Sequence, residues 1–125
     1  MKKIDENTCI RFKPRKSSEE DYVDIQNNLA EGCMQLDSVI HELLHVLGLW
    51  HEHMRADRDE HIKVHQKNIQ LGFKNQFAKM MAPDAATYGV PYDYLSIMHY
   101  PKDANAVPGT ITIETLDPKY QVKKY

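Results

Sequence analysis

Five residues in one short segment have the types and the spacing that a catalytic metal site needs: His41, Glu42, His45, Gly48 and His51. Histidines four residues apart lie on one face of a helix, so the imidazoles of His41 and His45 can converge on one ion. Gly48 lets the backbone leave the helix, so His51 can return toward the same ion. The three histidines therefore predict a metal site, and imidazole ligands at about 2.0–2.1 Å suit zinc.

Glu42 follows His41 directly and is therefore offset from it by about 100° around the helix. It misses the ion but can reach a water bound there. Zinc lowers the pKa of such a water toward about 7, and a neighbouring carboxylate can accept its proton and later deliver it to a leaving amine. This division of roles suits peptide hydrolysis. The alternative is a chance match, which five fixed positions make rare, on the order of one in a few million per start.

A second motif lies well downstream, in the segment Ser96-Ile97-Met98-His99-Tyr100. Taken alone, Met98 is more often a residue that fills the core. A methionine in a tight turn below a three-histidine site is the Met-turn of the metzincins. Together with the long histidine motif, the segment therefore predicts a Met-turn.

The residues from His41 to Asp59 resemble the signature of the astacin family, HExxHxxGxxHExxRxDR. Glu52, Arg55, Asp57 and Arg58 match the positions that separate astacins from other metzincins. The segment from Val90 to Tyr100 resembles the astacin Met-turn, and the likeness runs from about Lys2 to Thr115.

The resemblance implies roles beyond those of the metal ligands. Tyr100 matches the family tyrosine that can bind zinc and can swing away to stabilise the oxyanion. Its alternative reading is a packed aromatic ring. Glu52 matches the family glutamate that contacts the mature N-terminus. The remaining histidines have no ligand role in the pattern and are interpreted as surface or structural residues: His53, His61, His65 and His99.

The bulk properties limit the other classes of function. The 125 residues suit one domain over residues 1–125. The formal net charge is −2, and no basic stripe indicates a nucleic acid or an anionic membrane as partner. No apolar run approaches the roughly 20 residues of a membrane span, and the N-terminal residues do not resemble a signal peptide.

Local patterns predict the elements that position the site. A helix should begin near Asp37 or Ser38, carry an apolar stripe and end at Gly48; the stripe is Ile40, Leu43, Leu44 and Leu47. A second helix is predicted from Ile69 toward Pro83. Strands are predicted at three places, Cys9–Lys13, Tyr22–Ile25 and Thr110–Thr115. The segment from Tyr88 to Pro101 should form turns.

The chain also departs from the family pattern. The likeness implies that the first strand, most of the first helix, a middle segment with the substrate-pairing edge strand and the C-terminal helix are absent. We therefore expect an incomplete catalytic domain. By the resemblance, Cys9 and Cys33 both lack their family partners. The two cysteines alone leave open buried thiols or one disulfide.

The expected fold class is α+β: a metzincin-type zinc protease domain with a small twisted sheet packed on the zinc helix and a second helix. The expected activity is that of a zinc metalloendopeptidase with one zinc ion and polypeptide substrates. The alternative is a zinc-binding fragment without activity. A structural zinc module fits less well, because structural sites are usually closed by four ligands and rich in cysteine. The resemblance implies an extracellular location.

Overall fold

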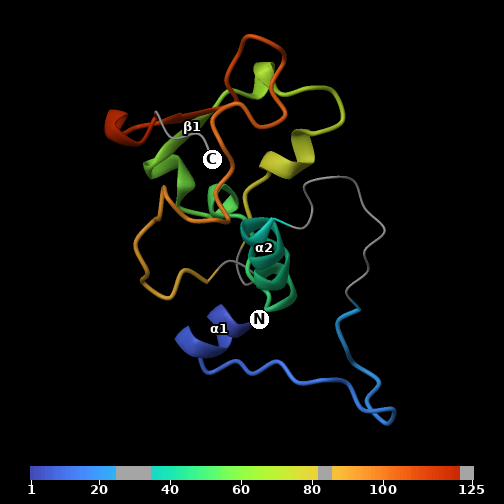
Figure 1. Cartoon of the computed structure of the whole chain (residues 1–125). Helices are drawn as coiled ribbons and strands as arrows, with labels where there is room; N and C mark the ends of the chain where they lie inside the picture. The colour runs from blue at the N-terminus through green and yellow to red at the C-terminus, as the bar shows by residue number, and fades with distance from the viewer. Residues whose placement is uncertain (25–34, 82–85, 122–125) are drawn as a thin grey trace. The chain divides into compact units, whose positions relative to one another are not determined.

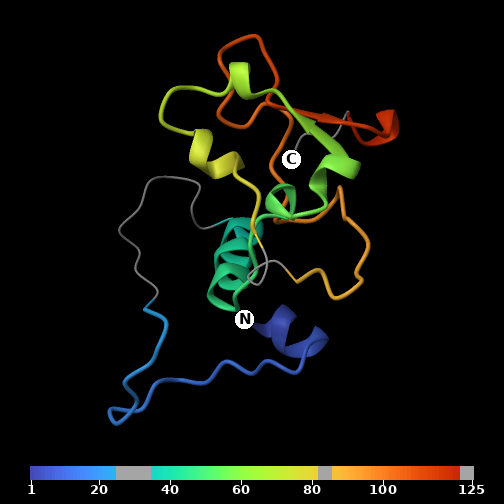
Figure 2. The ribbon, with the colours of Figure 1, turned by 180° about the vertical axis from the view of Figure 1, so that it is seen from behind.

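The computed structural model describes residues 1–24, 35–81 and 86–121 of the chain. These residues form two compact units, Met1–Gly48 and Leu49–Tyr125. Figure 1 and Figure 2 show the first unit from blue to teal and the second from green to red. The prediction of one domain over residues 1–125 stays a prediction.

The described part of the first unit contains two helices, α1 (Lys2–Asn7) and α2 (Leu36–Val46). Helix α2 begins one to two residues before the predicted start. Asp37 lies in its first turn, where a carboxylate interacts favourably with the helix dipole. The predicted stripe is the less exposed face of α2: Leu43 is buried, and Ile40, Leu44 and Leu47 are half-buried.

The end of α2 confirms the predicted role of Gly48. The backbone N–H of Gly48 donates to the carbonyl of His45 at 2.9 Å, and the φ angle of Gly48 is +90°. A side chain at this φ is strained. The glycine therefore follows the C-cap residue Leu47 and lets the chain leave the helix, three positions before His51.

The two strands predicted for the first unit are wrong within the described residues. Cys9–Lys13 is irregular, because side chains of the same unit take its backbone donors. The N–H of Ile10 donates to Thr8 Oγ1, and the N–H of Phe12 donates to Asp5 Oδ1. Residues 22–24 are also irregular, and the rest of that predicted strand lies outside the described residues.

The second unit is built from short elements around one antiparallel ribbon. Its strands are β1 (Ile62–Val64) and β2 (Ile113–Thr115), which lie side by side in both ribbon views. The ribbon pairs Lys63 with Glu114, and opposite charges directly across an antiparallel pair stabilise it. Among residues 49–81 and 86–121, the other elements are five 3₁₀ turns: η1 (Glu52–Met54), η2 (Arg58–Glu60), η3 (Gln66–Asn68), η4 (Lys74–Phe77) and η5 (Pro118–Tyr120).

One buried cluster forms the core of the second unit: Ile62, Ile69, Phe77, Tyr92 and Ile113. Both strands contribute to it, since β1 supplies Ile62 and β2 supplies Ile113. Tyr94 and Tyr100 from the predicted turn segment pack against the cluster. The segment from residue 88 to residue 101 does form turns. The core thus places Tyr100 through its contacts with the ribbon and η4.

The second helix predicted from Ile69 is wrong for the described residues. Ile69 and Phe77 are buried as the pattern requires, but only the 3₁₀ turn η4 lies between residue 70 and residue 81. Gly72 has a φ of +94°, which an α-helix does not permit. The strand predicted for Thr110–Thr115 is confirmed only as Ile113–Thr115. Thr112 lies just before this strand, and its hydroxyl donates to the carbonyl of Ala104.

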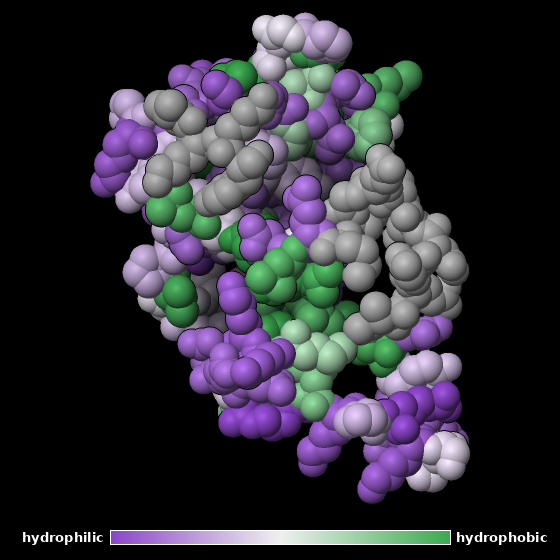
Figure 3. All heavy atoms as spheres, viewed as in Figure 1, coloured by the Kyte–Doolittle hydropathy of each residue, from purple (hydrophilic) through white to green (hydrophobic). Residues whose placement is uncertain are grey.

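The architecture is α+β, with helices and a small antiparallel sheet, as predicted. Several large apolar side chains remain exposed, among them Leu71, Met81 and Tyr88. Figure 3 shows apolar atoms in green between hydrophilic ones on the face in view. Among the residues that the structure describes, no helix has the length and apolar character to cross a membrane.

Candidate metal centre

His41 and His45 lie one turn apart on α2, as their spacing requires. Their ring centroids are 4.7 Å apart, and the rings meet edge to face at 89°. Both side chains are half-buried. The helix therefore presents two imidazoles that can share one ion.

His51 completes a group of three histidines. The possible ligand nitrogens of His41, His45 and His51 all lie within 4.8 Å of one another. Two nitrogens bound to one zinc ion at about 2.1 Å are at most about 4.2 Å apart, which is close to the separation of these nitrogens. A set of three imidazoles is the ligand set of a catalytic zinc centre, which keeps one position open for water. The residues present fit this ion.

Glu42 is exposed on α2 and does not belong to the group of possible ligands, which consists of the three histidines. The sequence places it next to the site but not on the ion. Its role as proton acceptor stays a prediction.

Tyr100 lies beside the third histidine within the second unit. The rings of Tyr100 and His51 have centroids 4.5 Å apart, and Tyr100 also stacks on His53 at 4.1 Å and 27°. The Tyr100 hydroxyl donates to Gln76 Oε1 at 3.1 Å. Tyr100 is therefore close to a proposed ligand and is also held by a polar contact that the sequence did not reveal.

His53 and His99 both contact Tyr100, His53 through its ring and His99 through the backbone carbonyl. Burial lowers the pKa of His53 to about 3, so the ring is neutral at pH 7 and its Nε2–H donates to the Gln76 carbonyl at 2.9 Å. Burial also lowers the pKa of His99. His99 Nδ1–H donates to the Tyr100 carbonyl, and His99 Nε2 accepts from the Tyr92 hydroxyl, both at 2.7 Å. Both histidines are structural, in agreement with the interpretation of the sequence.

The segment around Met98 is a tight turn. The N–H of Ser96 donates to the Asp93 carbonyl, the N–H of His99 donates to the Ser96 carbonyl, and Met98 is 2% exposed. The Met98 carbonyl accepts from the N–H of Glu52 at 2.9 Å. This bond ties the turn to the residue directly after His51.

Comparisons with known proteins agree with the three-histidine group and the turn around Met98. The family model of the astacin peptidases matches residues 25–124. The chain belongs to the astacin family. It is 46% identical to zinc metalloproteinase nas-5 of Caenorhabditis elegans, over 97% of this chain and 40% of that protein. It is 41% identical to zinc metalloproteinase nas-6 of the same organism, over 88% of this chain and 37% of that protein.

A solved structure confirms the fold. High choriolytic enzyme 1, a hatching enzyme zinc-protease from the medaka fish Oryzias latipes, matches with a TM-score of 0.65 and 36% identity. The match covers 70% of this chain and 42% of that chain. The chain thus spans about 40% of the length of nas-5 and nas-6. The alignment with nas-5 runs over 144 positions, more than the 125 residues present here, so nas-5 has residues inside the matched region that this astacin chain lacks.

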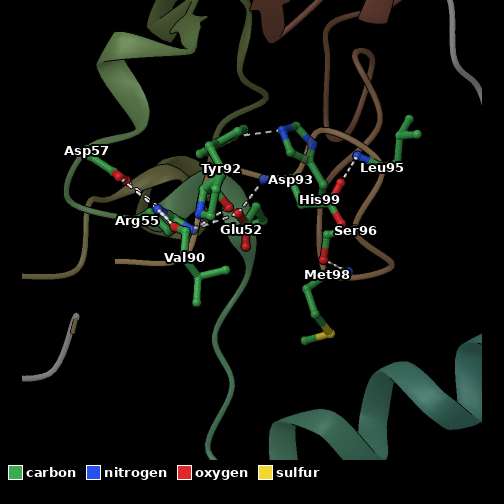
Figure 4. Close-up of polar contacts among 11 residues, drawn as sticks. Glu52, Arg55, Asp57, Val90, Tyr92, Asp93, Leu95, Ser96, Met98 and His99 are labelled. Carbon is green, nitrogen blue, oxygen red and sulfur yellow. Dashed lines mark hydrogen bonds and ion pairs between the residues drawn. The ribbon is translucent and has the colours of Figure 1, made fainter. Parts of the chain in front are cut away.

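Three of the four residues that match the distinguishing positions of the astacin signature, Glu52, Arg55 and Asp57, form an ion-pair network in the second unit (Figure 4). Arg55 makes two bonds to Asp57, at 3.0 and 2.8 Å, and one to Glu52 Oε1 at 3.1 Å. It also donates to the Val90 carbonyl at 2.9 Å, and Glu52 accepts from the N–H of Asp93. Hydrogen bonding to Asp57 raises the pKa of Arg55, and the Arg55 guanidinium lowers the pKa of Asp57. The network joins the segment after His51 to the start of the Met-turn.

We expect Arg55→Lys to lower the free energy of unfolding by about 1–3 kcal/mol. An ammonium group cannot reproduce the two parallel bonds to Asp57, and hydrogen bonds to charged groups are each worth about 1.5–3 kcal/mol. Urea unfolding measures the change. Arg11→Lys is the matched control, because exposed Arg11 donates to the nearby carbonyls of Thr8 and Ile10. Equal losses in the two variants would contradict a special role for Arg55.

Sequence reasoning missed Gln76 and the burial of His53. Gln76 lies in a segment predicted as a helix, and His53 lies in a segment with no regular apolar spacing, so neither shows a periodic signal. Cys9 is a free and exposed thiol, as the resemblance implied. Cys33 lies outside the described residues, so its redox state stays a prediction.

Proposed function

We propose that the protein containing this chain is a zinc-dependent metalloendopeptidase that hydrolyses peptide bonds in polypeptides. The group of three histidines carries the proposal, because its ligand nitrogens lie within 4.8 Å of one another in an astacin-family chain. Zinc, when bound there, supplies a Lewis acid and a water of lowered pKa.

The chain's own residues would perform the proton transfers. Glu42 would take the proton from the attacking water and deliver it to the amine that leaves, as a general base and then a general acid. Tyr100 would donate its hydroxyl proton in a hydrogen bond to the scissile carbonyl oxygen as negative charge develops there. The contact between the rings of Tyr100 and His51 supports this role. Gly48 directs the chain to His51, and Glu52 and Met98 hold the segments that carry His51 and Tyr100.

The site leaves cleavage specificity open, and the proposed substrate class follows from the family: extended polypeptides. Secretion is also proposed from the family. A second function is favoured by one observation. Because nas-5 has residues inside the matched region that this chain lacks, the chain could bind zinc without hydrolysing peptides.

Zinc stoichiometry and casein hydrolysis measured on one preparation distinguish these functions. We expect one zinc per chain and hydrolysis that stops when a chelator is added and returns with zinc. One zinc per chain without hydrolysis would instead establish the second function. No bound zinc would contradict both.

A further inference from the structure

Gln76 contacts both rings of the stacked pair formed by His53 and Tyr100. Its backbone carbonyl accepts from His53 Nε2 at 2.9 Å, and its side-chain Oε1 accepts from the Tyr100 hydroxyl at 3.1 Å. The two rings are 4.1 Å apart and nearly parallel. One residue of η4 therefore sets the position of the buried histidine and of the tyrosine hydroxyl.

The position of Gln76 is itself fixed on both sides. Its neighbour Phe77 is fully buried in the core of the second unit. Asn105 Nδ2 donates to Gln76 Oε1 at 3.0 Å, which keeps the amide oxygen turned toward Tyr100. Asn105 has a φ of +49°, a conformation that asparagine adopts more readily than most residues. The acceptor for Tyr100 is thus held in place before any ligand binds.

The Tyr100 hydroxyl has one proton and donates it to Gln76 in this structure. The same ring lies against His51 at 4.5 Å. Contact of the phenol oxygen with an ion or an oxyanion at the histidines therefore competes with its bond to Gln76. The strength of the hydrogen bond between Tyr100 and Gln76 then sets the fraction of molecules in which the Tyr100 hydroxyl can contact an ion or oxyanion at the histidines.

We propose that Gln76 is a positioning residue that docks the Tyr100 hydroxyl and competes with the metal site for it. This inference rests on the proposed role of Tyr100 at the metal. Gln76 does not touch the substrate and acts only through Tyr100.

Copper(II) exchanged into the full chain tests the proposal, because a phenol oxygen bound to copper(II) gives a charge-transfer absorption band. Gln76→Leu removes the acceptor but keeps the backbone carbonyl for His53, and we expect the band to rise about threefold to tenfold. Gln76→Glu offers a charged acceptor of the same shape, and we expect the band to fall by a similar factor. Opposite effects of the two variants are not expected from a purely structural role.

Two controls complete the experiment. Tyr100→Phe should remove the band in every background. Gln70→Leu should leave it unchanged, since Gln70 donates to the Ala106 carbonyl at an exposed position. The proposal would be overturned if the band changed in the same direction in both Gln76 variants or changed in neither. A band that survives Tyr100→Phe would also overturn it.

The zinc form of the unsubstituted protein is assayed with casein in parallel. Hydrolysis together with a band that does not respond to Gln76 overturns the docking role alone. A responsive band without hydrolysis overturns the proposed function and supports the docking role.

Discussion

Glu42→Gln should keep one metal ion per chain and lower casein hydrolysis by about 10²–10⁴-fold, the usual contribution of general acid–base catalysis. The amide cannot accept a proton from water, although its size and hydrogen-bonding reach are nearly unchanged. The metal should stay because Glu42 is absent from the group of possible ligands. Its exposure on α2 also means that the fold should not change.

Glu60→Gln is the matched control for this variant. Glu60 is also exposed but lies in η2, directly after the segment that resembles the astacin signature. The Glu60→Gln variant should hydrolyse casein at the rate of the unsubstituted protein. A Glu42→Gln variant that cleaves as fast as Glu60→Gln would exclude Glu42 as the proton acceptor.

The zinc-binding helix could be predicted from the sequence because its signals are local. The apolar stripe of α2 and the two histidines share one helical period, and Gly48 marks the end through its left-handed backbone. None of these signals depends on a distant partner. The group of three histidines could be predicted for the same reason, since His51 comes soon after His45 in the chain.

The second unit was harder to predict because distant contacts determine it. Ile62–Val64 forms a strand only through pairing with Ile113–Thr115, about 50 positions further along the chain. The spacing of Ile69 and Phe77 indicated a helix, but Gly72 interrupts it, and both side chains reach the core from turns.

The polar contacts of Tyr100 were also beyond the sequence. Gln76 lies 24 positions from Tyr100 and 29 positions from Asn105 in the chain. No periodic pattern connects such positions, because turns rather than regular elements bring them together. The resemblance named Tyr100 but gave no reason to expect an acceptor for its hydroxyl.

Removing the metal should lower the melting temperature of this chain by about 10–20 °C. Zinc at about 1,000 times its dissociation constant stabilises the folded state by about 4.1 kcal/mol, and each kcal/mol moves the midpoint of a domain of this size by several degrees. The rest of the fold offers little to offset this loss. Within the described residues the sheet has two strands of three residues, and the core cluster of the second unit has five buried members.

Thermal unfolding with and without a chelator measures the effect, and two histidine variants serve as controls. His51→Gln removes one of the three ligands, so chelation should shift its midpoint much less. His65→Gln removes a half-buried histidine that bonds to Glu114 on the ribbon, so its response to chelation should match that of the unsubstituted protein. A high melting temperature that chelation leaves unchanged would show that packing alone holds the fold. In that case the three histidines would contribute to the chemistry of the site and not to its stability.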